Sequence, residues 1–402
     1  MHAGTNQIRK ATQVLPSNRR GEKARKTNNS NKLTLQKPKP LKTKNNRHSK
    51  VIDFSNIYRV KSFHPINIIQ MRFFSFLFIL LFFQVKIFSQ TTLALVAERN
   101  NGEHIFETGN KYDNLSGLKG GSRITYPRNF NSLGIQASQV YNRFLLSGKF
   151  ITTGNFVNSG EARDEDFFLR ANSPENGTKI ATREWSLHDS AYVFSGTQNF
   201  ADGKGISTVS EYKIEPNIRY YFGDASPDFW KPSDGFFIST GLRYSYFKYY
   251  IYDVIQFVAT NPITYKPIGK GLSYANSVLE FPIGLGYKVS KDRLTLEFSF
   301  DIVYGVNKFK DFHYWRAMNF NGESGGFGFQ YKGEIYYRLS DSILFRFSHT
   351  GHRLFQSGYF TTKGGNSFND ILSNYAGKYS YYLNTKEFFY DLSIMKKLSS
   401  SK

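Results

Sequence analysis

Apolar side chains occupy every second position from Leu294 to Val306, and this alternation constrains the fold more than any other feature of the chain. Polar or small residues fill most of the positions between them. Residues two apart in an extended strand share a face, so the pattern predicts a strand with one face in an apolar medium. Segments 343–348 and 388–394 repeat the pattern. Such long strands are typical of a sheet that spans a membrane.

Segments of this character predict an all-β protein, a ten-stranded antiparallel transmembrane β-barrel. Bacterial single-chain barrels have an even number of strands, and each strand needs about 9–11 residues to cross the hydrocarbon. Short turns are expected at one end and long loops at the other, which faces outward. A soluble β-sandwich is the alternative, but the strand lengths and an aromatic content of 17% favour the barrel. The expected strands are 92–107, 121–140, 143–158, 205–222, 235–256, 270–289, 293–310, 318–339, 342–357 and 379–398.

Residues 71–90, MRFFSFLFILLFFQVKIFSQ, have the anatomy of a secretory signal peptide. A basic residue precedes an apolar core over 73–83, which is too short for a comfortable transmembrane helix. Ser89 is a small residue suited to the position before the cut. We therefore expect residues 91–402 to be the exported outer-membrane barrel.

Residues 1–70 carry most of the net charge of +22, and they contain only two acids. A basic tail of this kind could bind nucleic acid. A signal peptide belongs at an N-terminus, however, so we interpret residues 1–70 as a basic extension before the true start at Met71. A genuine cytoplasmic tail before a signal anchor is the alternative. The remainder of the chain is only mildly basic, and we expect no nucleic-acid partner.

Two short motifs carry the candidate chemistry. The expected connection after residue 158 begins GEARDEDFF, which places Asp164 and Asp166 two apart. The expected strand 293–310 leads into KDFHYW, which places Asp311 and His313 two apart. Extending the alternation of that strand puts Asp311 and His313 on the lumen face.

The parity of the two aspartates is less certain from sequence, because Gly160 lies before them and a bulge there would change it. An imidazole beside a carboxylate can accept a proton from water, and two close carboxylates favour keeping one proton between them. The chain has no cysteine, no GxSxG elbow and no HExxH spacing, so we expect neither a covalent nucleophile nor a metal. Solvated loop acids, or acids that bind divalent cations near charged lipids, are the plain alternative.

Residues 91–398 resemble the omptins, the ten-stranded outer-membrane endopeptidases of bacteria. The stretch FPIGLGYKVSKDRLTLEFSFDIVYGVNKFKDFHYW follows the omptin order of strand, tight turn, strand and DxHY ending, and DEDF resembles the omptin DxDW. The resemblance implies peptide-bond hydrolysis by an activated water without an acyl-enzyme. His313, oriented by Asp311, would activate the water, while Asp164 and Asp166 would position it and stabilise the tetrahedral intermediate.

The resemblance also implies contacts to substrate and lipid. Omptins cut near basic residues, which two acids hold, and they need lipopolysaccharide for activity. Glu103 corresponds to one of these acids, but Phe309 stands at the other position and cannot pair with a guanidinium. Asp189 is the candidate acid on the far side of the scissile bond. Lys288 stands where a family arginine binds lipid, whereas the omptin YxExR lipid motif is lost.

We therefore expect a monomeric omptin-like endopeptidase in the outer membrane of a diderm bacterium, with its active site outside. Polypeptide substrates and outer-membrane lipid are the expected partners, and activating lipopolysaccharide takes the place of a cofactor. A catalytically silent adhesin that binds host proteins and a small porin are the alternatives. Ten strands leave a narrow lumen that side chains largely fill, which disfavours the porin. We expect His349 and His352 to be solvated at the end of strand 342–357.

Overall fold

The computed structural model describes residues 91–109, 118–171, 192–194, 201–257, 269–375 and 377–398. The chain divides into two compact units, 1–74 and 75–402, and every described residue belongs to the second. The predicted extension 1–70 and the predicted signal segment 71–90 lie outside the described residues. The elements are β1 (Thr91–Gly109), β2 (Leu118–Pro127), β3 (Phe130–Tyr141), β4 (Phe144–Thr152), β5 (Val157–Ala171), β6 (Tyr192–Phe194), β7 (Ala201–Tyr221), β8 (Gly235–Gly241), β9 (Arg243–Phe257), β10 (Lys270–Lys291), β11 (Leu294–His313), β12 (Met318–Arg338), β13 (Ile343–Gly364), α2 (Phe368–Ser373) and β14 (Tyr379–Leu398).

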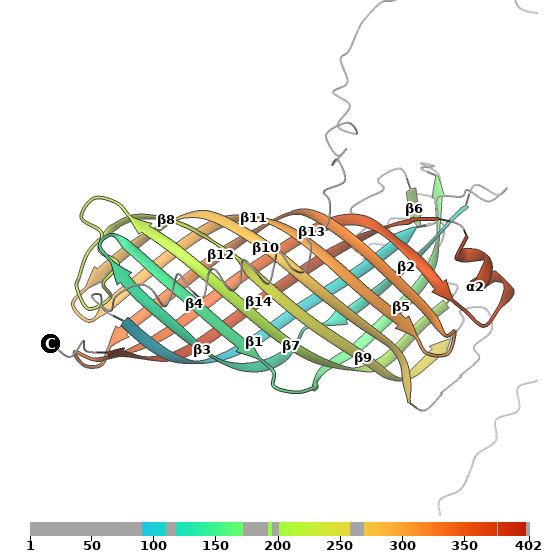
Figure 1. Ribbon diagram of the computed structural model, residues 1–402, viewed down its shortest axis with the longest axis horizontal. Coiled ribbons are helices and arrows are strands. Elements are labelled where there is room, and N and C mark those ends of the chain that lie inside the picture. The colour runs from blue at the N-terminus through green and yellow to red at the C-terminus, as the bar shows by residue number, and fades with distance from the viewer. Residues whose placement is uncertain are drawn as a thin grey trace, which may run out of the picture. The chain divides into compact units, whose positions relative to one another are not determined.

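The strands form an antiparallel sheet that closes on itself, because β14 pairs with β1 (Figure 1). Ten hydrogen-bonded strands make up the ring, so the predicted ten-stranded barrel is confirmed. Breaks at residues 128–129, 153–156 and 242 divide some of these strands into β2 and β3, β4 and β5, and β8 and β9. The helix α2 lies between β13 and β14, in a connection that the sequence predicted as a loop.

The two ends of the barrel differ in their connections. The end that holds Thr91 and Leu398 has tight turns, in which Asn142 and Asp292 adopt a left-handed conformation with φ of 52°. Asn and Asp tolerate this conformation better than most residues, so they suit two-residue hairpins. We call this end the turn end. The opposite end carries α2, β6 and the last residues of β11, and we call it the loop end (Figure 1).

The outer face of the ring is apolar, as a membrane requires. Burial alternates residue by residue along β11, and the outward side chains of Phe300 and Ile302 are 50% and 62% exposed. Toward the loop end, Lys308 and Lys310 replace apolar residues on this face. The last residues of β11 therefore extend beyond the apolar band. No helix in the described part of the chain is long and apolar enough to cross a membrane.

Buried ion pairs fill the lumen behind the apolar band. Lys149 lies 2.8 Å from Glu98 and 2.9 Å from Asp391. Arg243 is bound in the same way, at 2.9 Å from Glu215 and 3.2 Å from Glu280. Charges removed from water require such partners, and each of these cations bridges two acids.

The space left among these pairs is small. A polar cavity of about 80 Å³ remains, lined by acids and bases alike, with room for several water molecules. The lumen at this level is therefore a packed ionic layer.

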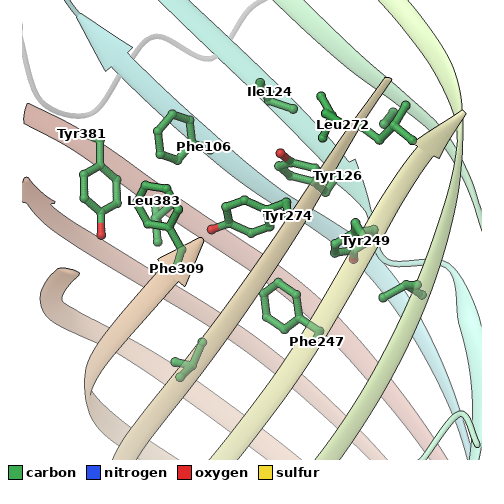
Figure 2. Close-up of a cluster of buried hydrophobic side chains, with 14 of the residues drawn as sticks. Phe106, Ile124, Tyr126, Phe247, Tyr249, Leu272, Tyr274, Phe309, Tyr381 and Leu383 are labelled. Atoms are coloured by element: carbon green, nitrogen blue, oxygen red, sulfur yellow. The ribbon is translucent and has the colours of Figure 1, made fainter. Parts of the chain in front are cut away.

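An aromatic layer lies between the ionic layer and the loop end, and Figure 2 shows its buried side chains. The ring of Phe309 lies 5.2 Å from that of Phe106 and 4.9 Å from that of Tyr381. Tyr274 stacks on Phe309 at 5.6 Å and on Tyr126 at 4.6 Å. Rings 4.5–7 Å apart gain about 0.5–1.5 kcal/mol per pair beyond their buried area. This layer is the apolar core of the barrel.

The connection between β7 and β8 closes the lumen at the turn end. Phe229 is 7% exposed, and its ring stacks on that of Tyr336 at 4.2 Å. The buried Lys288 Nζ donates to the backbone carbonyl of Ser226 at 2.6 Å, and Arg338 Nη1 donates to that of Trp230 at 2.6 Å. The connection is longer than the other turns at this end, and its length lets it fold into the lumen mouth.

Candidate active site

Asp311 and His313 form a hydrogen-bonded pair at the loop end of β11. Both stand on the inward parity of that strand, as the alternation predicted. The His313 Nε2–H donates to Asp311 Oδ2 at 3.1 Å, and the side chains are 20% and 7% exposed, respectively. In the neutral ring, a proton on Nε2 leaves Nδ1 with a free lone pair. The carboxylate therefore selects the tautomer in which Nδ1 can accept a proton.

The pKa of His313 lies above its ordinary value. Burial of the imidazole lowers this pKa, but the charge of Asp311 and its hydrogen bond raise it by more. Asp164 raises it further, whereas the nearby Arg316 lowers it. Two carboxylates stabilise the imidazolium, so the ring is a stronger base than free histidine.

Asp164 comes to this site from the opposite part of the ring. It lies within β5, where its Cα partner on β2 is the buried, inward-facing Ile124. The sequence placed Asp164 and Asp166 in a loop after residue 158, and this was wrong, because β5 continues to Ala171.

A β-bulge sets the parity of β5. The register of β5 against β7 shifts between Asn158 and Gly160, and Gly160 has φ of 119°, a conformation that favours glycine. Beyond the bulge, Asp164 lies on the inward parity. Asp166 follows two residues later with Ser122 as its register partner, so its backbone position has the same parity.

Aromatic side chains surround the dyad. The ring of Phe320 lies 4.8 Å from that of His313. Phe309, two residues before Asp311, is 2% exposed and belongs to the aromatic layer beneath the dyad. An apolar floor keeps bulk water away from the dyad on that side and strengthens its electrostatics.

The other predicted contact residues do not join this group. Glu103 lies on the outward parity of β1 and pairs in register with Lys386, whereas its neighbour His104 points into the lumen. Asp189 lies outside the described residues. Lys288 faces the lumen at the turn end and is 0% exposed, so its predicted role as a lipid-binding residue is wrong.

The structure brings polar residues to the lumen that the sequence analysis missed. His352 is 3% exposed and lies 3.1 Å from Glu280 and 3.4 Å from Glu387, so its expected solvation was wrong. Tyr126 and Tyr274 lie under the dyad, and no local motif marks them. The even positions of β2 and β10 face the lumen, so alternation counted along either strand would have placed both tyrosines inside.

Among the described residues, no cluster of three or more His, Asp or Glu side chains is arranged to hold a metal ion. The chemistry visible at the loop end is that of a base, its orienting carboxylate and a second carboxylate from across the lumen. Such a set can remove a proton from water and stabilise the charge that follows.

A family of bacterial barrel proteins accounts for most of the chain. Residues 111–392 match the family described as "Putative porin". The chain belongs to this family. It is an outer-membrane β-barrel of the porin family, and no curated protein matches it.

Solved structures place this porin-family barrel among outer-membrane barrels. It is similar to the outer membrane protease OmpT from Escherichia coli, with a TM-score of 0.55 at 10% identity, covering 78% of this chain and 99% of that chain. The translocator domain of the autotransporter NalP from Neisseria meningitidis gives a TM-score of 0.32 at 10% identity, covering 82% and 96%. The outer membrane protein OprG from Pseudomonas aeruginosa gives 0.28 at 8% identity, covering 78% and 97%. The family match is thus to porins, and the likeness to a protease is one of fold.

Proposed function

We propose that this porin-family barrel is an outer-membrane endopeptidase whose active site opens at the loop end, on the outside of the cell. The observation that carries the proposal is the lumen-facing Asp311–His313 hydrogen bond, with Asp164 close enough to act on the same imidazole. The fold shared with an outer membrane protease agrees with this activity, without establishing it.

The proposed reaction uses a water as the nucleophile. His313 Nδ1 accepts a proton from that water as its oxygen attacks the carbonyl carbon of the scissile bond, and Asp311 stabilises the imidazolium that forms. Asp164 and Asp166 share a proton and donate it in a hydrogen bond to the developing oxyanion. The imidazolium then protonates the leaving amine, which restores the neutral ring.

We expect the substrate preference to differ from that of omptins. Phe309 is buried in the aromatic layer, and Glu103 faces away from the lumen, so neither supplies a carboxylate for a basic side chain. Cleavage without a preference for basic residues is therefore the expected outcome. Lipopolysaccharide remains a proposed activating lipid, and the assay below includes it as a variable.

Peptide-library cleavage tests the proposal directly. Barrel purified from outer membranes would be incubated with a diverse peptide library, with and without lipopolysaccharide, and products identified by mass spectrometry. Asp311→Asn, His313→Ala and Asp164→Asn should each lower cleavage by about 100-fold or more, because general acid–base catalysis contributes roughly 10²–10⁴-fold. Glu323→Gln is the matched control, since this exposed acid pairs with Lys308 on the outward face and lies outside the dyad. A folded parent barrel that cuts no peptide under either condition would refute the proposal.

The family membership favours a second candidate, a diffusion pore. Three features argue against a pore, because each would have to move before a solute could pass. They are the ionic layer, the aromatic layer and the connection between β7 and β8 that holds Phe229. Planar-bilayer recording decides between the two. We expect no stable open-channel conductance from the parent barrel, and steady conductance would establish the pore. Binding to host proteins that survives His313→Ala, without cleavage, would instead indicate an adhesin.

We also propose that translation begins at Met71 and that residues 71–90 are removed on export. Peptide mapping of the protein from its native cells tests this. A tryptic peptide from residues 1–70 would refute the start, and an N-terminus near residue 91 would support the cut.

A further inference from the structure

A buried hydroxyl group with no evident structural role lies beside the dyad. Tyr126 is 0% exposed, and its Oη has no hydrogen-bond partner among the described residues. Its aromatic neighbours differ in this respect. Tyr249 Oη donates to the carbonyl of Pro127 at 3.1 Å, and Tyr274 Oη bonds to His104 Nε2 at 2.9 Å. A buried hydroxyl without a partner costs about 1–3 kcal/mol, so phenylalanine would suit this position better if packing were its purpose.

Asp311 has an orphan atom of the same kind. Its Oδ2 accepts from His313, while its Oδ1 is buried and has no hydrogen-bond partner in the part of the chain that the structure describes. Two such atoms, one donor and one acceptor, are complementary.

The strands bring these two groups to the same place. Figure 2 shows Tyr126 beside Tyr274; their ring centroids are 4.6 Å apart and their planes differ by 22°. The Cα partner of Tyr274 on β11 is Asp311. On the other side, Ile124 lies two residues before Tyr126 on the same face and pairs with Asp164. Tyr126 therefore lies between the two carboxylates of the candidate site.

The hydroxyl at this place keeps its proton and is therefore able to donate a hydrogen bond. Burial raises the pKa of Tyr126 well above its ordinary value, and the charges of Asp311, Tyr274 and Asp164 raise it further. The group keeps its proton at every pH at which the dyad could work.

We propose that Tyr126 is a positioning residue for the dyad, whose hydroxyl reaches Asp311 Oδ1 through one buried water and fixes the carboxylate so that Oδ2 faces His313. The kinetic consequences of this inference rest on the proposed function, whereas the water site is independent of it. A bridging water needs at least two polar partners, and the hydroxyl and Oδ1 supply one donor and one acceptor.

The Tyr126→Phe variant tests the role in the protein purified from outer membranes. A hydrogen bond to a charged group contributes about 1.5–3 kcal/mol, so kcat should fall by roughly 10- to 100-fold while KM stays unchanged. Removing a donor also removes positive potential near the dyad. The pKa of His313 should therefore rise, and the acidic limb of the pH–rate profile should move to higher pH.

The control is Tyr249→Phe, which removes a hydroxyl of equal burial from the same ring cluster and leaves the dyad alone. It should lose stability and keep kcat. If Tyr126 serves packing only, Tyr126→Phe should keep kcat and the His313 pKa and should gain stability, and that result would overturn the proposal.

Two readouts separate this inference from the proposed protease. A high-resolution crystal structure should show a water within hydrogen-bond distance of Tyr126 Oη and Asp311 Oδ1, and this water should be lost in Tyr126→Phe. NMR titration of His313 should show the higher pKa in that variant. If the parent cuts no peptide but both readouts appear, the protease fails and the positioning role stands. If the parent cuts peptides and neither readout appears, the positioning role fails alone.

Discussion

Replacing Arg219 by leucine tests whether the ionic layer stabilises the barrel through paired charges. Arg219 is 8% exposed; its Nη2 lies 2.6 Å from Glu334 Oε2 and its Nη1 contacts Glu297. Without the guanidinium, Glu334 keeps its ion pair with Lys332 at 2.9 Å. Among the described residues, Glu297 keeps a hydrogen bond from the hydroxyl of Tyr221, also at 2.9 Å. Glu297 would then be a buried charge without an ion-paired cation among the described residues, although the charge of Lys288 would still act on it.

The expected loss in the free energy of unfolding follows from the ion-pair partners that each acid keeps. Removing one member of a buried pair costs about 3–5 kcal/mol, because the remaining charge is neither hydrated nor neutralised. Replacing both members by apolar residues of similar volume is often nearly neutral. Arg219→Leu with Glu297→Leu should therefore recover most of the loss, to within roughly 2 kcal/mol of the parent.

Urea titration of the barrel in lipid vesicles, followed by tryptophan fluorescence, measures both free energies of unfolding. Lys308→Ala is the matched control, since its pair with Glu323 is 2.9 Å long but exposed on both sides, and such pairs contribute about 0–1 kcal/mol. A loss below about 1 kcal/mol for Arg219→Leu, or a double variant as unstable as the single one, would refute the reasoning.

Three further predictions concern the connection between β7 and β8, the bulge at Gly160 and the dyad. Phe229→Ala should lower the free energy of unfolding by about 3 kcal/mol, because it removes a buried ring stacked on Tyr336; the same urea titration measures it. Gly160→Ala should cost roughly 1–3 kcal/mol, since φ of 119° strains any side chain, and it should lower cleavage by shifting Asp164; an unchanged cleavage rate would contradict the role of the bulge. The pKa of His313 is raised in the fold, so its stabilising contribution is complete below about pH 6.5 and is lost as pH rises through the raised value. Cleavage should instead increase over that interval as the neutral base forms, and NMR titration of the ring checks both.

The fold could be predicted from the sequence because its main signal is local. In a barrel, each strand meets lipid on one face and the lumen on the other, so the alternation along β11 contains both facts without any knowledge of its neighbours. The same alternation predicted that Asp311 and His313 lie on the lumen face. Nothing interrupts the register between Leu294 and His313, and parity counted over the whole strand holds.

Counting alternate residues does not give the face of a side chain where the backbone is irregular. The local sequence also does not show which residues meet across the lumen. Gly160 shifts the register of β5, so the face of Asp164 could not be read by counting. His352 was expected to be solvated because its partners, Glu280 and Glu387, come from β10 and β14. Lys288 was assigned to lipid from the position of a family residue, but its even parity on β10 directs it into the lumen. Assigning a face from the strand's own alternation would have avoided that error.

The layers of the lumen also bear on why a narrow porin-family barrel could support hydrolysis. Among the described residues, ion pairs and aromatic rings fill the interior below the dyad, so we expect bulk water to reach Asp311 and His313 from the loop end. A base that water approaches from one side meets its substrate on that same side, and the low-dielectric floor strengthens its bond to the carboxylate. A diffusion pore requires the opposite arrangement, a hydrated path past both layers. The features that close the pore are therefore the ones that would make a site at the loop end effective, and conductance and cleavage should exclude one another in this chain.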